Sequence, residues 1–211
     1  MEFIDLGLID YDAAYQRQKE AVDKVLTGEA ERIFLCEHPA VLTLGRLADS
    51  NYIRYPREEL SRRKITVKSI DRGGEVTLHA PGQLVIYPIL DLRHYGKDLK
   101  RYLFLLEQVA IDLLREFDIL ASRISGRTGA WAGDKKIASI GIGVKKWVSF
   151  HGLAVNLNTD LKLFSLIKPC GLDVQMTSVA DLKKTPVNMP QAKNVLKQVF
   201  ENILKSENCY A

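Results

Sequence analysis

The spacing of hydrophobic and polar residues changes along the chain, and each change predicts a different element. In residues 96–116, apolar residues recur every three or four positions, which is the spacing of one buried face of a helix. This face contains Leu99, Leu103, Leu106, Ala110, Leu113 and Leu114. Helices are also predicted over residues 11–26, where Asp10 is a suitable N-cap, and over residues 56–63 and 191–204.

Short apolar runs between these helices predict strands. They cover residues 1–8, 32–36, 40–46, 65–70, 84–90, 131–132, 135–144 and 147–156. Gly133-Asp134 separates two of the runs by two residues, which is a hairpin signal. Pro169 disfavours a regular helix in residues 163–171, where we expect a loop or a short helical turn. Because strands and helices interleave irregularly, we predict a mixed α/β (α+β) fold, a single domain over residues 1–211.

One segment has neither the helical spacing of apolar residues nor a short apolar run typical of a strand. Between two predicted strands the chain reads Arg72-Gly73-Gly74-Glu75-Val76-Thr77-Leu78-His79-Ala80-Pro81-Gly82-Gln83, and we expect a loop there. Paired glycines allow positive φ angles or close approach of the backbone to a ligand. The arginine can hold a carboxylate or phosphate, or organise the loop, and the histidine can carry a proton near neutral pH. A glycine-rich turn attached to a strand predicts a binding site.

The overall composition excludes several classes of protein. The 211 residues carry a net charge of +4, which is too small to indicate nucleic-acid binding but suits an acidic protein partner. No apolar run approaches the ~20 residues that span a membrane, and the N-terminus does not resemble a secretory signal. Three widely spaced cysteines do not form a disulfide framework, so we expect a cytoplasmic protein with reduced thiols.

A group of basic residues precedes the glycine-rich segment. It consists of Arg54, Arg57, Arg62, Arg63, Lys64 and Lys68. Such a group is usually a solvated face, and the alternative is a docking surface for an acidic partner.

The cysteines and lysines offer candidate reactive groups. Cys170 lies between a proline and a glycine, which leaves its sulfur sterically open, although a small buried side chain is the more usual fate of a free cysteine. Cys36, inside an apolar strand, is expected to be structural, and Cys209 lies in a polar tail. Lys135 and Lys136 begin a predicted strand, so one of them faces the interior and is a candidate base; alternatively both extend to water.

Other signatures are absent. His79 and His151 are candidates for lining a pocket or for structural hydrogen bonds, and the four histidines do not have metal-ligand spacing. The P-loop, the dinucleotide-binding glycine pattern and the Gly-x-Ser-x-Gly elbow do not occur. We therefore expect neither a metal nor a nucleotide site of these types.

Four blocks, in order, resemble the lipoate-protein octanoyltransferases, also called lipoyl(octanoyl) transferases. They are residues 35–46 with Glu-His-Pro and Thr-Leu-Gly-Arg, residues 72–83 with the following Tyr-Pro-Ile, residues 136–141 reading Lys-Ile-Ala-Ser-Ile-Gly, and His151-Gly152-Leu153-Ala154-Val155-Asn156 with Pro169-Cys170-Gly171. Each block is moderately specific, and the ordered set is highly specific. One departure is Ala80, where many family members have glycine, and it removes no chemical group.

The resemblance implies a biotin/lipoate protein ligase-like fold with a central mixed sheet flanked by helices. It implies transfer of an octanoyl group from the phosphopantetheine of acyl carrier protein to a lysine of lipoyl domains, including those of 2-oxoacid dehydrogenase complexes and the glycine cleavage H protein. By the same resemblance, Cys170 would form the acyl-thioester, and Lys136 would activate the thiol and move protons, with His151 in support. The reaction would need no ATP, metal or other cofactor. The implied acyl pocket consists of Arg72, Gly73, Gly74, Glu75, Val76, Thr77, Leu78, His79, Ser139, Ile140, Gly141, Gly152, Leu153 and Ala154.

Three other functions compete with this one. An ATP-dependent lipoate or biotin ligase needs no cysteine nucleophile, so Pro169-Cys170-Gly171 argues against it. An amidotransferase that moves octanoyl between lipoyl domains would place its cysteine elsewhere. A non-enzymatic module that only binds the carrier would not need Cys170, Lys136 and His79 together.

Overall fold

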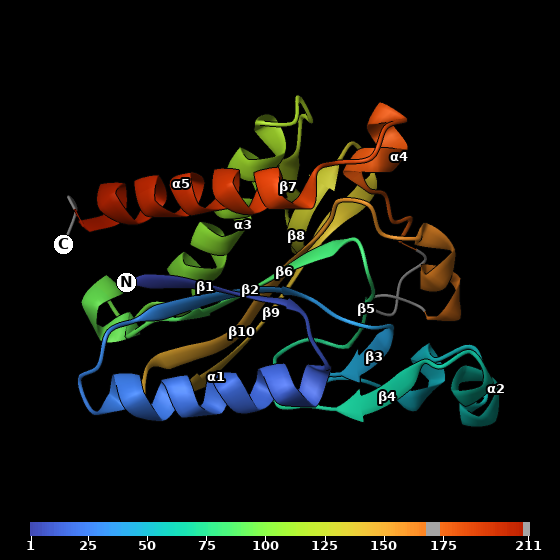
Figure 1. Cartoon of the computed structure of the whole chain (residues 1–211), viewed down its shortest axis with the longest axis horizontal. Helices are drawn as coiled ribbons and strands as arrows, with labels where there is room; N and C mark the ends of the chain where they lie inside the picture. Colours follow the sequence, from blue (N-terminus) through green and yellow to red (C-terminus); the bar gives the residue numbers. More distant parts are fainter. Residues whose placement is uncertain (168–173, 209–211) are drawn as a thin grey trace.

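The computed structural model describes residues 1–167 and 174–208, and a large mixed sheet forms their centre (Figure 1). In this part of the chain the sheet has seven strands, in the order β1 (Glu2–Leu8), β2 (Arg32–Glu37), β6 (Gln83–Ile89), β10 (Val148–Asn156), β9 (Lys135–Lys145), β8 (Arg127–Ala132) and β7 (Ser122–Ile124). β1 and β2 are parallel, and the other neighbouring strands are antiparallel.

Helices cover both faces of this sheet (Figure 1). α1 (Tyr11–Leu26) packs on one face, and α3 (Leu99–Arg115) and α5 (Met189–Asn208) pack on the other. Asp10 begins α1 as predicted, because its side chain accepts a hydrogen bond of 2.9 Å from the backbone N–H of Asp12. Every residue of the central strands β6 and β10 is buried, so neither strand alternates between apolar and polar residues: β6 is a nearly continuous apolar run, and β10 also contains the buried polar residues Ser149, His151 and Asn156.

A second, smaller sheet lies at one end of the molecule, at the right of Figure 1. Its order is β4 (Thr66–Ser69), β3 (Val41–Leu44) and β5 (Val76–His79). α2 (Arg57–Arg62) and the 3-10 helix η3 (Leu161–Leu166) supply Leu60, Phe164 and Leu166 to the core beneath it. The remaining described elements are η1 (Ser50–Tyr52), η2 (Leu92–Tyr95) and α4 (Val179–Lys183). No helix in the described residues combines the length and apolar character of a membrane-crossing segment.

The structure corrects the prediction of a loop over residues 72–83. Residues 76–79 form β5, which pairs antiparallel with β3. Only this pairing partner, which is distant in sequence, makes so short a segment a strand. β7 and α4 were not predicted, because segments of three and five residues are too short for the spacing of apolar residues to repeat. The main helix begins at Leu99, whose side chain is largely exposed, and Tyr102, Leu105 and Val109 complete its buried face.

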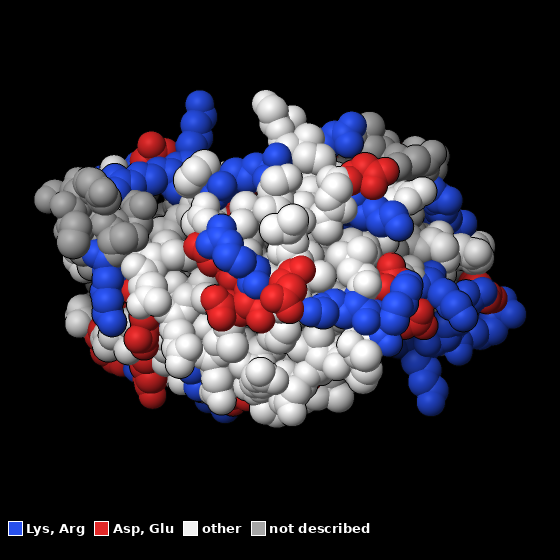
Figure 2. Space-filling view, turned by 90° about the horizontal axis from the view of Figure 1, so that it is seen from above, with Lys and Arg blue, Asp and Glu red and all other residues white. Residues whose placement is uncertain are grey.

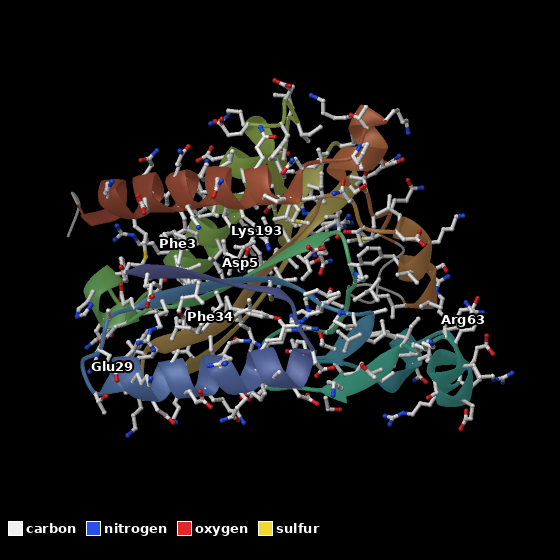
Figure 3. The ribbon with its side chains drawn as sticks, in the orientation of Figure 1. Phe3, Asp5, Glu29, Phe34, Arg63 and Lys193 are labelled. Atoms are coloured by element: carbon white, nitrogen blue, oxygen red, sulfur yellow. The ribbon has the colours of Figure 1, made fainter. Side chains whose placement is uncertain are left out.

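An ion pair connects the first strand to the last helix. In Figure 3, Lys193 of α5 points toward Asp5 of β1, and its Nζ lies 2.7 and 2.9 Å from the two carboxylate oxygens. Burial alone would raise the pKa of the Asp5 carboxyl, but hydrogen bonds from Lys193 and from the Gly7 N–H, with the charges of Lys193 and Lys197, lower it below the ordinary 3.8. Asp5 is therefore more acidic in the folded protein than in the unfolded chain.

We expect Lys193→Met to lower the free energy of unfolding by about 1 kcal/mol at neutral pH, a small effect because water screens the half-exposed Asp5. Since the pKa is depressed on folding, this contribution is present above pH 3.8 and is lost as the pH falls through the folded pKa. Urea unfolding at pH 7 and pH 3 measures it. Lys205→Met, at an exposed position of the same helix, is the control, and an equal difference at both pH values would contradict the prediction.

Candidate active site

The glycine-rich segment lies between the two sheets and is hydrogen-bonded to both. On one side, the backbone N–H groups of Gly45, Arg46 and Leu47 donate to the carbonyls of Glu75, Arg72 and Gly74 over 3.0, 3.0 and 3.1 Å. On the other side, the N–H of Gly73 donates to the carbonyl of Ile142 in β9 over 2.8 Å. The segment is therefore held rigidly against β9, as a binding-site wall requires.

Arg72 organises this segment. Its Nη2 donates to the carbonyl and hydroxyl oxygens of Thr43 over 2.8 and 3.0 Å and to the carbonyl of Glu75 over 2.8 Å. Its Nη1 donates to the carbonyl of Gly73 over 2.9 Å. Of the two roles open from sequence, the contacts favour organising the loop over holding an anionic ligand, because Nη1 and Nη2 donate to protein oxygens.

β9 and β10 bring the two other predicted pocket segments together. Gly152 pairs with Gly141, Leu153 with Ile140, and Ala154 with Ser139. A Cβ on Gly141 would lie 2.9 Å from Cδ of Arg72 and 3.0 Å from the carbonyl oxygen of Gly73. Glycine is needed at position 141 because the glycine-rich segment rests directly on the strand.

Two adjoining cavities open between these segments. The larger, of about 450 Å³, includes among its lining residues Arg72, Gly73, Gly74, Glu75, Val76, Thr77, Lys136, Ser139, Ile140 and Gly141. The smaller, of about 40 Å³, is lined by Tyr11, Arg72, Thr77, His79, Val85, Tyr87, Ser139, Ile140, Gly141, His151, Gly152, Leu153 and Ala154. Leu78 lines neither cavity, because it is fully buried in the core of the small sheet.

Lys136 faces the larger cavity and is 4% exposed, while Lys135 is only half-buried. The sequence predicted that one of these two adjacent lysines faces the interior, and in the structure it is Lys136. Its backbone N–H donates to the carbonyl of Gln175 over 2.8 Å, and its carbonyl accepts from the N–H of Thr177 over 2.9 Å. The chain just after residue 173 thus runs beside the lysine.

The predicted nucleophile, Cys170, lies outside the described residues, as does Cys209. Val174, four positions after Cys170, lines the larger cavity together with Lys136. Cys36 is fully buried in β2, and burial raises the pKa of its thiol, so it is inert as expected.

His79 belongs to a buried cluster of rings on the α1 side of the sheet. Its Nδ1 donates to Oε1 of Gln83 over 2.8 Å, and its ring stacks on Tyr11 with centroids 6.0 Å apart. Burial, with the neighbouring His38, lowers the pKa of His79 to about 3. Of the roles open from sequence, the lowered pKa and the bond to Gln83 favour a neutral hydrogen-bonding ring over a carrier of a proton near neutral pH.

His151 connects β10 to the start of the glycine-rich segment. Its Nε2 donates to the carboxylate of Asp71 over 2.9 Å, and its ring stacks on Tyr15 with centroids 5.4 Å apart. Burial lowers the pKa of His151 despite the attraction of Asp71. Its φ of 55°, unusual for a residue other than glycine, turns the ring toward α1. The supporting role in catalysis that the resemblance implies for His151 stays a prediction.

Several lining residues were not found from the sequence. Tyr11, Val85 and Tyr87 border the smaller cavity, and Trp131 borders the larger one. Each resembles an ordinary core residue of its helix or strand, so only the spatial neighbours reveal it. Within the described residues, no group of three or more His, Cys, Asp or Glu side chains is placed to hold a metal ion.

The sequence comparisons connect this site to a known family. Residues 10–201 match the model of the lipoyl protein ligase A/B catalytic domain. An octanoyltransferase of Maridesulfovibrio salexigens is 39% identical over 205 residues, which cover 96% of each chain, and one of Syntrophotalea carbinolica is 43% identical over 208 residues, covering 98% of this chain and 95% of the relative. The chain belongs to the octanoyltransferase family. The enzyme is therefore an acyltransferase for octanoyl groups in protein lipoylation, which confirms the expectation from the four sequence blocks.

More distant structures share the fold. A bipartite lipoate protein ligase of Thermoplasma acidophilum superimposes with a TM-score of 0.73 at 16% identity, covering 97% of the enzyme and 83% of the ligase. The biotin protein ligase of Aquifex aeolicus, in complex with biotin and ATP, gives a TM-score of 0.59 at 14% identity, covering 98% and 72%. These likenesses confirm the predicted ligase-like fold and, at such identities, carry no argument about activity.

Proposed function

We propose that the octanoyltransferase takes its acyl group from octanoyl-acyl carrier protein, holds it as a thioester on Cys170, and passes it to a lysine of a lipoyl domain without ATP or metal. The observation that carries the proposal is the position of Lys136. Its side chain is buried at a cavity lined also by the glycine-rich segment, β8 and β9, and Val174, in the chain that follows Cys170, lines the same cavity.

The chemistry divides into two acyl transfers. In the first, the Cys170 thiolate attacks the thioester carbonyl of the donor, and the pantetheine thiolate leaves and takes a proton from the Lys136 ammonium. In the second, the acceptor amine attacks the new thioester, loses a proton to Lys136, and releases the Cys170 thiolate. The first step exchanges one thioester for another at nearly equal free energy, and the amide product is lower in free energy, so no nucleotide is needed.

The cavities suit an alkyl chain. Ile140, Leu153, Ala154 and Val85 present apolar side chains, and the glycines present backbone. The two histidines at the smaller cavity are hydrogen-bonded to residues outside its lining, His79 to Gln83 and His151 to Asp71. A mainly apolar lining with few polar groups is typical of a pocket for a hydrocarbon chain.

Intact mass of the purified enzyme after incubation with octanoyl-carrier protein, without ATP, tests the proposal. We expect one octanoyl adduct that hydroxylamine removes, and no adduct on Cys170→Ala. Cys36→Ala is the matched control and should still be acylated, because Cys36 is fully buried in β2. Transfer that requires ATP, or an adduct that persists in Cys170→Ala, would refute the thioester mechanism.

The basic group predicted from the sequence gathers around α2, at the right of Figure 2. Arg62 and Arg63 pair with Glu59, and Lys68 pairs with Asp12. Arg57 and Lys64 are exposed and form no ion pair with the described residues, so we propose them as the strongest contacts for the acidic carrier.

Reversing both charges, in Arg57→Glu with Lys64→Glu, is expected to raise the KM for octanoyl-carrier protein about tenfold and to flatten its dependence on salt, with kcat unchanged. Initial rates at two ionic strengths measure this. Lys19→Glu with Lys24→Glu, on the exposed side of α1, reverses the same charge elsewhere. An equal effect of both double variants on KM would show that only the net charge of the enzyme matters, which would contradict docking at Arg57 and Lys64.

A further inference from the structure

We propose that Gly129 and Trp131 of β8 are positioning residues that fix the place of the Lys136 ammonium. The inference rests on the proposed role of Lys136 in proton transfer. Both residues act on the lysine from the neighbouring strand, one by leaving space for it and the other by attracting its charge.

Gly129 leaves room for the lysine side chain. A Cβ at this position would lie 2.8 Å from Cε of Lys136 and 3.4 Å from its Nζ, as well as 2.4 Å from the carbonyl oxygen of Ala138. The φ angle of 129° also favours glycine. The lysine therefore passes directly over the backbone of β8, and any side chain at position 129 would displace it.

That backbone is itself held in place. The N–H of Gly129 donates to a carboxylate oxygen of Glu107 in α3 over 3.0 Å, and the other oxygen of Glu107 accepts from Nε of Arg123 over 3.0 Å. The backbone under the lysine is thus connected to α3, which restrains the surface against which the lysine side chain lies.

Trp131 attracts the ammonium. Nζ of Lys136 lies 5.5 Å from the centre of the indole ring, within the range of a cation–π interaction. A change of register between Ala130 and Trp131 places Trp131 directly opposite Lys136 in the strand pair. The ring is 1% exposed, and its Nε1 donates to the carbonyl of Arg127 over 3.2 Å, so its orientation is fixed. Tryptophan offers the strongest cation–π surface among the side chains.

The test is a double-mutant cycle with Lys136→Met. We expect Gly129→Ala to lower kcat for octanoyl transfer on the order of 10- to 100-fold with KM unchanged, because displacing a reacting group by about 1 Å has effects of this size. In the Lys136→Met background the same change should lower the remaining rate by less than about twofold, since its effect passes through the lysine. Gly133→Ala is a control for alanine at a positive φ angle: its φ of 62° lies in the left-handed region, and no atom lies within 4 Å of the added Cβ.

Trp131 is tested by a conservative pair. Trp131→Phe keeps an aromatic face and is expected to retain most of kcat, whereas Trp131→Leu should lower kcat about tenfold. The two variants are expected to be equally stable in urea unfolding. Equal activity of Phe and Leu, or an equal loss from Gly129→Ala in both backgrounds, would overturn the inference and leave the two residues structural. If Lys136→Met itself transfers octanoyl at the wild-type rate, the proposed function fails instead, and the two failures are distinguishable.

Discussion

Replacing Lys136 by methionine is expected to lower the rate of octanoyl transfer by about 10²- to 10⁴-fold, the usual contribution of a positioned proton-transfer group. Methionine preserves most of the length of the side chain beside Trp131 while removing the amine proposed to exchange a proton. Because the replaced cation is 4% exposed, stability should be unchanged or higher. Single-turnover transfer from octanoyl-carrier protein measures the rate, and thermal unfolding measures the stability.

Lys135→Met is the matched control, since Lys135 precedes Lys136 on the same strand and is only half-buried. It should retain the wild-type rate within about twofold. A loss in Lys135→Met equal to that in Lys136→Met would mean that the strand needs positive charge in general, which would contradict a specific proton-transfer role.

Gly152→Ala is expected to destabilise the fold by about 3 kcal/mol or more, an effect at the upper end for overpacking. The added Cβ would lie 2.3 Å from the carbonyl oxygen of Ile86 and 2.6 Å from Cδ of Pro88, both on the adjacent strand β6. Neither atom can move without moving a fully buried central strand. Urea unfolding measures the change.

Gly73→Ala is the control for stability. The nearest atom to its added Cβ, the carbonyl oxygen of Ile142, is at an ordinary contact distance of 3.6 Å, so we expect a change below about 1 kcal/mol. An equally small effect of Gly152→Ala would show that β6 and β10 can separate at this point, contrary to the close approach in the structure.

Elements with a complete local pattern were predictable from sequence. α1 has its predicted bounds and its predicted cap at Asp10, because the cap and the helical spacing are properties of neighbouring residues. The hairpin at Gly133-Asp134 was predicted for the same reason. β5 was not, since its four residues become a strand only through pairing with β3.

The candidate site also combines features that were predictable from sequence with features that depend on tertiary contacts. The sequence blocks identified Ser139–Gly141 and Gly152–Ala154 as separate segments, but their residue-by-residue pairing depends on the register of β9 against β10. Arg72 was a candidate for ligand binding or for organising the loop, and the positions of Thr43 and Glu75 decide for the loop. His79 was a candidate proton carrier, and its burial beside His38 makes it neutral.

The sequence by itself determined the family, the main helices and strands, and most residues of the cavities, because these depend on residue order and local spacing. Only the tertiary structure decided that Lys136 rather than Lys135 faces the cavity, that Tyr11 and Tyr87 line the smaller cavity, and that Gly129 and Trp131 lie against the lysine. The physical reason is that burial, pKa and side-chain contact depend on neighbours that are distant in sequence, which are specified only once the strands have paired and the helices have packed.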